Sequence, residues 1–191
     1  MDRREAIKQL AFLSGGALSL STVAGIMGGC TAENGGGGSF TPQTLSDAQH
    51  ELVIQLSERI IPATDTPGAK AARVNQYIDH MLTNWNTEEE KDHFLEGLGK
   101  VDELSNDQFD SNFVDLGEAD QITLMEELER EAQDNPKPDS NLKPFFSMMK
   151  EFTVVGYYTS EIGASEELNS NIVPGHYNAC MPYSEVGRAW S

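Results

Sequence analysis

Five segments of the sequence carry apolar residues that recur every three or four positions, and this spacing constrains the fold more than any other feature. Because an α-helix makes one turn about every 3.6 residues, apolar residues at this spacing form a stripe along one side of each helix. The sequence shows no long alternation typical of a half-buried strand and no internal repeat. We therefore predict an all-α fold, a compact bundle of about five helices, over residues 46–61, 70–83, 87–104, 118–133 and from 144 onward.

Two of these helices begin with a capping box, "SDAQ" at Ser46 and "TEEE" at Thr87. The most apolar segment, "FFSMMKEFTVVGYYTSEIG", is expected to be the central helix. The residues expected to be buried in that helix are Phe145, Met148, Met149, Phe152, Val155 and either Tyr157 or Tyr158. The other helices are expected to bury Leu45, Leu52, Val53, Leu56, Ile60, Val74, Ile78, Met81 or Leu82, Phe94, Leu95, Leu98, Val101, Ile122, Met125 and Leu128.

The stretch "ERIIPATDTPGAK", residues 58–70, interrupts the apolar pattern with two prolines, an acid and a glycine. Pro62 is expected to end the first helix, and Pro67 fixes φ in the turn that follows. Asp65 is expected to cap this turn by accepting backbone N–H bonds, and Gly68 is expected to tolerate a positive φ. We interpret the stretch as a structural turn that sets the angle between two helices, in preference to a catalytic loop.

Residues 1–29 have the features of an export signal. Arg3 and Arg4 form a twin arginine, and Ile7 and Lys8 follow at the spacing of a twin-arginine signal. The mildly apolar stretch behind them is rich in Gly and Ser, which suits an export signal better than a helix. The alternatives to a twin-arginine signal peptide are an amphipathic helix with a chance arginine pair and a permanent transmembrane helix.

The signal ends in "IMGGC", where small residues precede Cys30 as they do in a lipobox. Met27 is unusual at its position, so a plain signal peptidase site near Gly29 is the alternative. Residues 30–44, with four consecutive glycines, are predicted to form a flexible tether behind a lipidated cysteine. Residues 45–191 are predicted to be the helical domain, on the periplasmic side of the cell envelope and lipid-anchored to a membrane through Cys30.

The formal net charge of −18 argues against a nucleic-acid partner. The two cysteines and four histidines form no HExxH, CxxC or CxxCH motif, and the sequence has no GxGxxG, P-loop or GxSxG motif. Cys180 lacks a basic neighbour in sequence, which favours a structural thiol over a nucleophile. We therefore assign no catalytic, cofactor-binding or metal-binding residue to this chain.

The sequence from residue 164 onward lacks helical periodicity and is rich in Pro, Gly, Asn and Tyr, which predicts an irregular C-terminal tail. Its aromatic residues Tyr177, Tyr183 and Trp190 are costly to leave in water. They are therefore expected to pack on the helices or to lie on a partner.

Several of these stretches together resemble the gluconate 2-dehydrogenase subunit 3 family. They are the twin-arginine leader, "LSERIIPATDTPGAKAARVNQYIDHML", the aromatic helix "FFSMMKEFTVVGYYTSEIG", and "VPGHYNACMPY" with "GRAW" near the C-terminus. The resemblance covers about residues 45–191, and "IIPATDTPGA" is its most specific piece. Cys30 with its glycine tether departs from the family pattern and leaves a cytochrome partner open.

The resemblance implies a small accessory subunit of a membrane-bound sugar or sugar-acid dehydrogenase. In that family a large subunit of the glucose–methanol–choline type binds FAD and performs the oxidation, and a c-type cytochrome subunit often takes the electrons onward. The small subunit escorts the folded flavoprotein through the twin-arginine translocase and stays bound to it. The cofactor expected is therefore FAD in the partner, and the residues expected to contact that partner are Pro62, Asp65, Pro67, Gly68, Tyr177, Tyr183 and Trp190.

Two functions of other classes stay open at this point. One is a free-standing envelope lipoprotein that acts as a binding or scaffold module. The other is an enzyme with an unrecognised site around His176 and Cys180.

Overall fold

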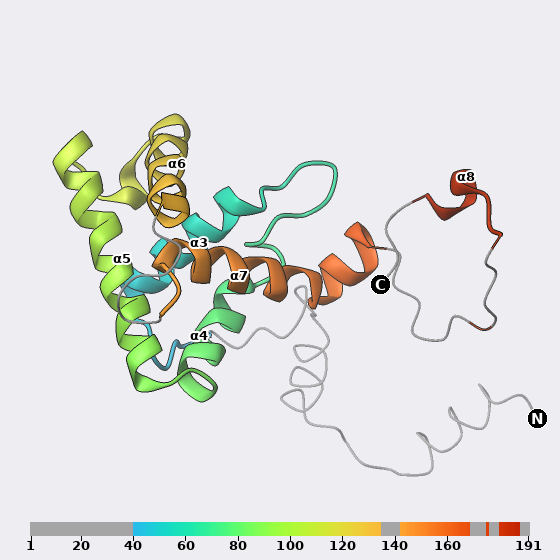
Figure 1. Ribbon diagram of the computed structural model, residues 1–191, viewed down its shortest axis with the longest axis horizontal. Coiled ribbons are helices and arrows are strands. Elements are labelled where there is room, and N and C mark those ends of the chain that lie inside the picture. The colour runs from blue at the N-terminus through green and yellow to red at the C-terminus, as the bar shows by residue number, and fades with distance from the viewer. Residues whose placement is uncertain (1–39, 135–141, 169–174, 176–179, 188–191) are drawn as a thin grey trace, which may run out of the picture. The chain divides into compact units, whose positions relative to one another are not determined.

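The computed structural model describes residues 40–134, 142–168, 175 and 180–187 of the chain (Figure 1). All the described helices belong to one unit, Thr41–Ser191. These residues are helical and contain no strand, which confirms the all-α prediction and the bundle of about five helices. In chain order the elements are α3 (Asp47–Ile60), α4 (Val74–Asn84), α5 (Glu88–Phe109), the 3₁₀ turn η1 (Phe113–Asp115), α6 (Glu118–Asp134), α7 (Phe145–Tyr158), the π-helical turn η2 (Gly163–Glu167) and α8 (Tyr183–Val186).

Both predicted capping boxes are present. The Ser46 hydroxyl accepts a hydrogen bond from the Gln49 backbone N–H at 3.3 Å, and the Gln49 side chain accepts one from the Ser46 N–H at 3.0 Å. At the start of α5, Thr87 and Glu90 make the same reciprocal pair. The hydrogen bond from the Thr87 N–H stabilises the ionised Glu90 carboxylate and lowers its pKa. Each box satisfies N–H groups that the first turn of a helix leaves without partners.

Two helix boundaries differ from the prediction. α4 begins at Val74 instead of near Lys70, because Arg73 has a left-handed φ of 57° that a continuous helix cannot contain. α5 continues past Leu104 to Phe109, and both of these side chains pack against the core. Burial therefore extends this helix beyond the point where the sequence pattern weakens.

The prediction that α7 is the central helix is confirmed. It packs against α3, α4, α5 and α6 (Figure 1). The ring of Phe94 on α5 lies 5.2 Å from that of Phe145 and 5.8 Å from that of Phe152, both on α7. The buried residues of α7 are Phe146, Met148, Met149, Thr153, Gly156 and Tyr157.

Most of the predicted core is buried, and four further residues are half-buried and pack against it: Ile60, Leu95, Phe145 and Phe152. Two predictions are wrong. Ile122 on α6 is 42% exposed, because α6 buries the neighbouring Gln121 instead. The Gln121 side chain accepts a hydrogen bond from Arg59 Nε at 2.7 Å and donates one to the carbonyl of Phe113 at 2.9 Å. Val155 is also exposed, because it lies on the side of α7 opposite the buried residues.

The two alternatives that the spacing left open are resolved by burial. Leu82 is buried, whereas Met81 is half-buried. Tyr157 is buried and Tyr158 is exposed. In each pair the buried residue is the one that continues the inward stripe of its own helix.

A buried carboxylate on α4 fastens the segment that leads into α3. Asp79 is buried, and its two oxygens accept hydrogen bonds from the backbone N–H groups of Gln43, Thr44 and Leu45 at 2.9, 3.0 and 3.0 Å. A charged acceptor makes stronger hydrogen bonds than a neutral one. The chain is therefore attached to the helical domain from Gln43 onward.

Candidate functional site

The most specific stretch of the sequence forms a loop between α3 and α4, and we call residues 61–70 the proline loop. Its neck is closed by a hydrogen bond from the Ala69 N–H to the carbonyl of Ile61 at 2.9 Å. Glu58, in the last turn of α3, accepts the Ala63 N–H on one oxygen at 3.1 Å and the Lys70 N–H on the other at 2.8 Å. One carboxylate therefore holds the two ends of the loop together.

The prediction that Asp65 caps this turn is wrong. The backbone N–H groups bind Glu58, whereas Asp65 accepts a hydrogen bond from the Thr64 hydroxyl at 3.1 Å. The loop folds back so that the Ala63 and Lys70 N–H groups both come within hydrogen-bond distance of the Glu58 carboxylate.

Gly68 is needed for a reason other than the one predicted. Its φ is not positive, since the positive-φ glycines in the described residues are Gly175 and Gly187. A Cβ atom on Gly68 would instead lie 2.5 Å from Glu58 Oε1 and 2.6 Å from the Ala63 nitrogen. The glycine therefore lets the Glu58 carboxylate reach both backbone N–H groups.

Two side chains from the far end of the chain hold the proline loop from the other side. The Tyr157 hydroxyl on α7 donates to the carbonyl of Pro67 at 2.7 Å, and Glu167 in η2 accepts from the Thr66 hydroxyl at 2.6 Å. The loop is thereby fixed to three separate elements, α3, α7 and η2. Its tip, from Pro62 to Asp65, stays exposed.

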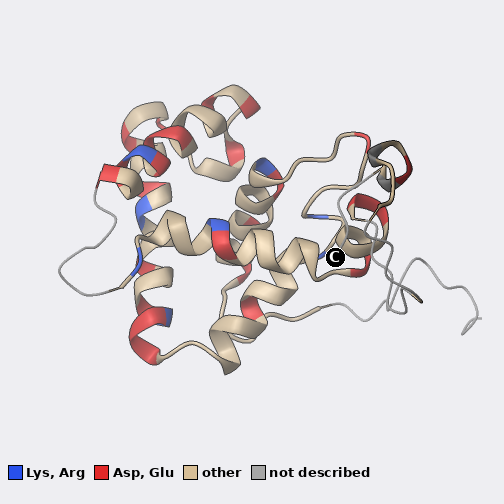
Figure 2. Cartoon of the chain, turned by 45° about the vertical axis from the view of Figure 1, so that its right-hand side comes forward, with Lys and Arg blue, Asp and Glu red and all other residues tan. Residues whose placement is uncertain are grey.

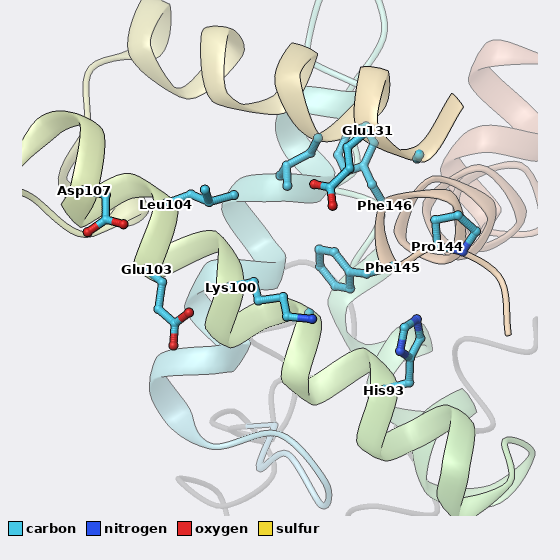
Figure 3. Close-up of a pocket in the computed structure, with 12 residues that line it drawn as sticks. His93, Lys100, Glu103, Leu104, Asp107, Glu131, Pro144, Phe145 and Phe146 are labelled. Atoms are coloured by element: carbon cyan, nitrogen blue, oxygen red, sulfur yellow. The ribbon is translucent and has the colours of Figure 1, made fainter. Parts of the chain in front are cut away.

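A pocket of about 490 Å³ lies between α5, α6 and the start of α7 (Figure 3). Two of its polar side chains are engaged with neighbours: a ring nitrogen of His93 lies 3.0 Å from the carbonyl of Lys143, and Lys100 pairs with Glu96 at 3.0 Å. In Figure 3 the Glu103 carboxylate points away from the pocket floor. The apolar part of the lining comprises Leu104, Leu128, Ala132, Phe145 and Phe146. Asp107 and Glu131 also line the pocket, and in Figure 3 the Glu131 carboxylate points toward Phe145.

The described histidines lie apart from one another. His50 is paired with Asn75 at 2.6 Å, and His80 lies 3.1 Å from the amide of Asn84. Within the described residues, no group of three or more His, Cys, Asp or Glu side chains is arranged to hold a metal ion. None of the helices in this part of the chain is long and apolar enough to cross a membrane.

A model of the gluconate 2-dehydrogenase subunit 3 family matches residues 47–175. The chain belongs to this family. The match includes the proline loop and the helices α3 to α7, so the resemblance noted in the sequence is confirmed. Membership supports a role for this subunit 3 protein as an accessory subunit of such a dehydrogenase complex. Comparisons with curated proteins and with solved structures gave no match.

The structure places only some of the residues for which the sequence predicts a role. In the subunit 3 protein Pro62 and Asp65 are exposed, Pro67 is half-buried and Gly68 is buried. Only the first two therefore offer most of their surface to a partner. Tyr183 lies in α8, but its side chain is outside the described set, and Arg3, Arg4, Cys30, His176, Tyr177 and Trp190 lie outside the described residues altogether.

Sequence reasoning missed the side chains that hold the proline loop in this subunit 3 protein. Glu58 lies only five residues from Ala63 but twelve from Lys70, so the pair of hydrogen bonds that it accepts depends on how the loop folds back. Tyr157 and Glu167 had no local signal, since they are 90 and 101 residues away in sequence from their hydrogen-bond partners.

Replacing Tyr157 by Phe removes the hydrogen bond to Pro67 and is expected to lower the free energy of unfolding by about 1 kcal/mol at neutral pH. Urea titration monitored by circular dichroism measures this loss. Tyr158→Phe is the matched control, because that neighbouring ring is exposed and should leave the free energy unchanged within error. An equal loss in both variants would contradict the role of the Tyr157 hydroxyl.

The same variant is expected to change the pH dependence of stability. Burial raises the pKa of the Tyr157 phenol above its ordinary value of 10.0. The unfolded chain therefore releases this proton at a lower pH than the folded one, so the contribution to stability is complete below pH 10 and is lost above it. Tyr157→Phe should lack this part of the alkaline loss, and an unchanged slope of stability against pH would contradict it.

Proposed function

We propose that this protein is a non-catalytic small subunit of an FAD-dependent sugar or sugar-acid dehydrogenase, and that it binds and escorts the folded flavoprotein subunit. The observation that carries the proposal is the family match over residues 47–175. The FAD belongs to the partner subunit in this proposal, and the small subunit contributes a preformed binding surface.

The geometry of the proline loop supports binding more than chemistry. Both Glu58 oxygens are occupied by backbone N–H groups, and the hydroxyls of Thr66 and Tyr157 donate to fixed acceptors. These hydrogen bonds fix the conformation of the proline loop. Because the carboxylate and the two hydroxyls are already bonded within the protein, they are not placed to exchange protons with a substrate. An exposed tip on a rigid base suits recognition of another protein, because little conformational freedom is lost on binding.

Export and anchoring form the second part of the proposal. Arg3 and Arg4 would direct the complex to the twin-arginine translocase, and Cys30 would carry the lipid that anchors it on the periplasmic side of a membrane. A c-type cytochrome subunit would accept electrons from the flavoprotein in those complexes that include one.

Co-expression with an FAD-dependent dehydrogenase large subunit from the same genome tests the binding role. The small subunit, tagged at its C-terminus, is expected to retain the large subunit through affinity and size-exclusion chromatography, with flavin absorbance in the same peak. A small subunit that always elutes alone, beside a stable and flavin-loaded large subunit, would contradict the proposal.

Replacing Arg3 and Arg4 together by Lys is expected to leave both proteins in the cytoplasm, because the translocase reads the arginine pair. Cell fractionation followed by immunoblotting measures where both subunits are found. The amount of each subunit in the envelope fraction is expected to fall at least tenfold. Lys8→Arg is the control, since it changes the same leader outside the pair. Normal amounts of the flavoprotein in the envelope fraction of the double variant would refute the escort role.

A further inference from the structure

Within the described residues, the second half of α7 is the longest stretch without a charged side chain, in a strongly acidic protein. Between Glu151 and Glu161 the nine residues 152–160 carry no charge, whereas the whole chain has a net charge of −18. In Figure 2 this part of α7 is drawn without red or blue, whereas α5 and α6 contain several red, acidic positions. This part of α7 therefore differs from the rest of the acidic surface in carrying no charged side chain.

Three apolar side chains of this segment are exposed together. Val154, Val155 and Tyr158 are 42, 41 and 38% exposed, and their spacing places them in one lane along the helix. We call these three residues the α7 face. The other sides of α7 are covered by α3, α4, α5 and α6, so the α7 face is the lane that those helices leave open.

The α7 face is held on a rigid support. Gly156 lies on the opposite side of the helix, where it allows the ring of Tyr77 on α4 to approach closely. Tyr157, beside the face, is fixed by its hydrogen bond to the carbonyl of Pro67 in the proline loop. The rings of Tyr157 and Tyr158 meet edge to face, with centroids 5.3 Å apart. The face and the proline loop are therefore joined through a pair of aromatic rings whose geometry is already set.

Carboxylates lie mainly at the C-terminal end of this apolar lane. Glu161 and Glu166 follow Tyr158 in the chain and are exposed, and Glu166 lies near enough to Tyr157 to act on it electrostatically. Two lysines lie near the start of the lane: Lys143 pairs with Glu151, one turn before the lane, at 2.5 Å, and Lys150 pairs with Glu129 on α6 at 2.6 Å. An apolar centre with an acidic rim is complementary to a surface that has an apolar centre and a rim of Lys and Arg.

We infer that the α7 face is the surface on which the catalytic subunit of the dehydrogenase complex docks, through an apolar patch with a basic rim. The inference rests on the proposed function, because family membership supplies the partner and charge complementarity supplies the chemistry of its patch. The proline loop then lies at the edge of this interface and fixes Tyr158 through Tyr157. A face centred on two valines and a tyrosine excludes water once covered, which is where binding energy concentrates in protein interfaces.

The double variant Val155→Asp with Tyr158→Asp places two charges in the centre of the α7 face. It is expected to weaken binding of the co-expressed, flavin-loaded catalytic subunit at least tenfold, as measured by biolayer interferometry on the purified proteins. Ile122→Asp is the matched control, because Ile122 is 42% exposed on α6, outside this face, and its variant should bind like the wild type. Thermal unfolding of each free variant confirms that the charges leave the fold intact.

The outcomes separate this inference from the proposed function. Wild-type protein that fails to bind the catalytic subunit would overturn both. Normal binding by the wild type and by the double variant would overturn the α7 face alone, as would a loss seen equally in Ile122→Asp.

A photo-crosslinking amino acid at position 158 identifies what covers the face in the assembled complex. A cross-link to the catalytic subunit is expected. A cross-link confined to the protein's own C-terminal residues, or to a second copy of the chain, would overturn the inference.

Discussion

Replacing Asp79 by Ala is expected to lower the free energy of unfolding by about 3 kcal/mol, the largest loss that we expect from one substitution. The carboxylate is buried and accepts three backbone N–H groups, from Gln43, Thr44 and Leu45. Alanine leaves all three donors without this acceptor, and burial makes an unpaired donor costly. Urea unfolding of the full chain measures the change, with a lower midpoint and the same slope expected.

Two variants show whether the hydrogen bonds cause this loss. Asp107→Ala removes an exposed carboxylate from α5 and should change the free energy of unfolding by less than about 0.5 kcal/mol. Asp79→Asn keeps one carbonyl oxygen as an acceptor and should fall between the wild type and Asp79→Ala. A loss in Asp79→Ala no greater than in Asp107→Ala would show that the three hydrogen bonds contribute little.

Replacing Gly68 by Val is expected to lower the free energy of unfolding by about 2 kcal/mol and to weaken binding of the catalytic subunit. A Cβ atom at this position lies within 2.6 Å of both Glu58 oxygens and of the Ala63 nitrogen, which is backbone and cannot move aside alone. The Glu58 carboxylate is therefore displaced from the two N–H groups that it holds. Thermal unfolding and the chromatography with the flavoprotein measure the two effects.

Gly99 offers a matched control for the glycine substitution. It is exposed in the middle of α5, and a Cβ atom there would meet nothing within 4 Å. Gly99→Val should therefore leave stability unchanged or raise it by about 0.5 kcal/mol, because valine is a better helix former than glycine. Normal stability and normal partner binding in Gly68→Val would show that the proline loop tolerates displacement of Glu58.

The fold was largely predictable because apolar spacing and capping boxes are local signals. Ser46 and Thr87 start their helices as predicted, and α7 is the central helix. The failures occur where contacts between distant segments override a local signal. The left-handed φ of Arg73 delays α4, and the buried hydrogen bonds of Gln121 turn Ile122 outward.

The candidate site was predictable in position but not in mechanism. The prolines and the glycine correctly marked a structural turn, and the reasons assigned to Asp65 and Gly68 were wrong. A side chain such as Tyr157, brought to the loop by tertiary packing, leaves no trace in local sequence. The exposure of the α7 face was also not predictable from the sequence. A helix that is apolar on nearly every side is expected to be fully buried, so its pattern does not indicate which side is exposed.

The contact between Asp79 and the segment before α3 also has a mechanical meaning. A pulling force applied to the chain before Gln43 reaches α4 through three hydrogen bonds that share one carboxylate. The donor residues precede the first residue of α3, so such a force loads the three hydrogen bonds before it reaches the helix. Because α4 packs against α7, the carboxylate that bears this load belongs to a helix anchored in the core, and the N-terminal turn of α3 lies behind it in the chain.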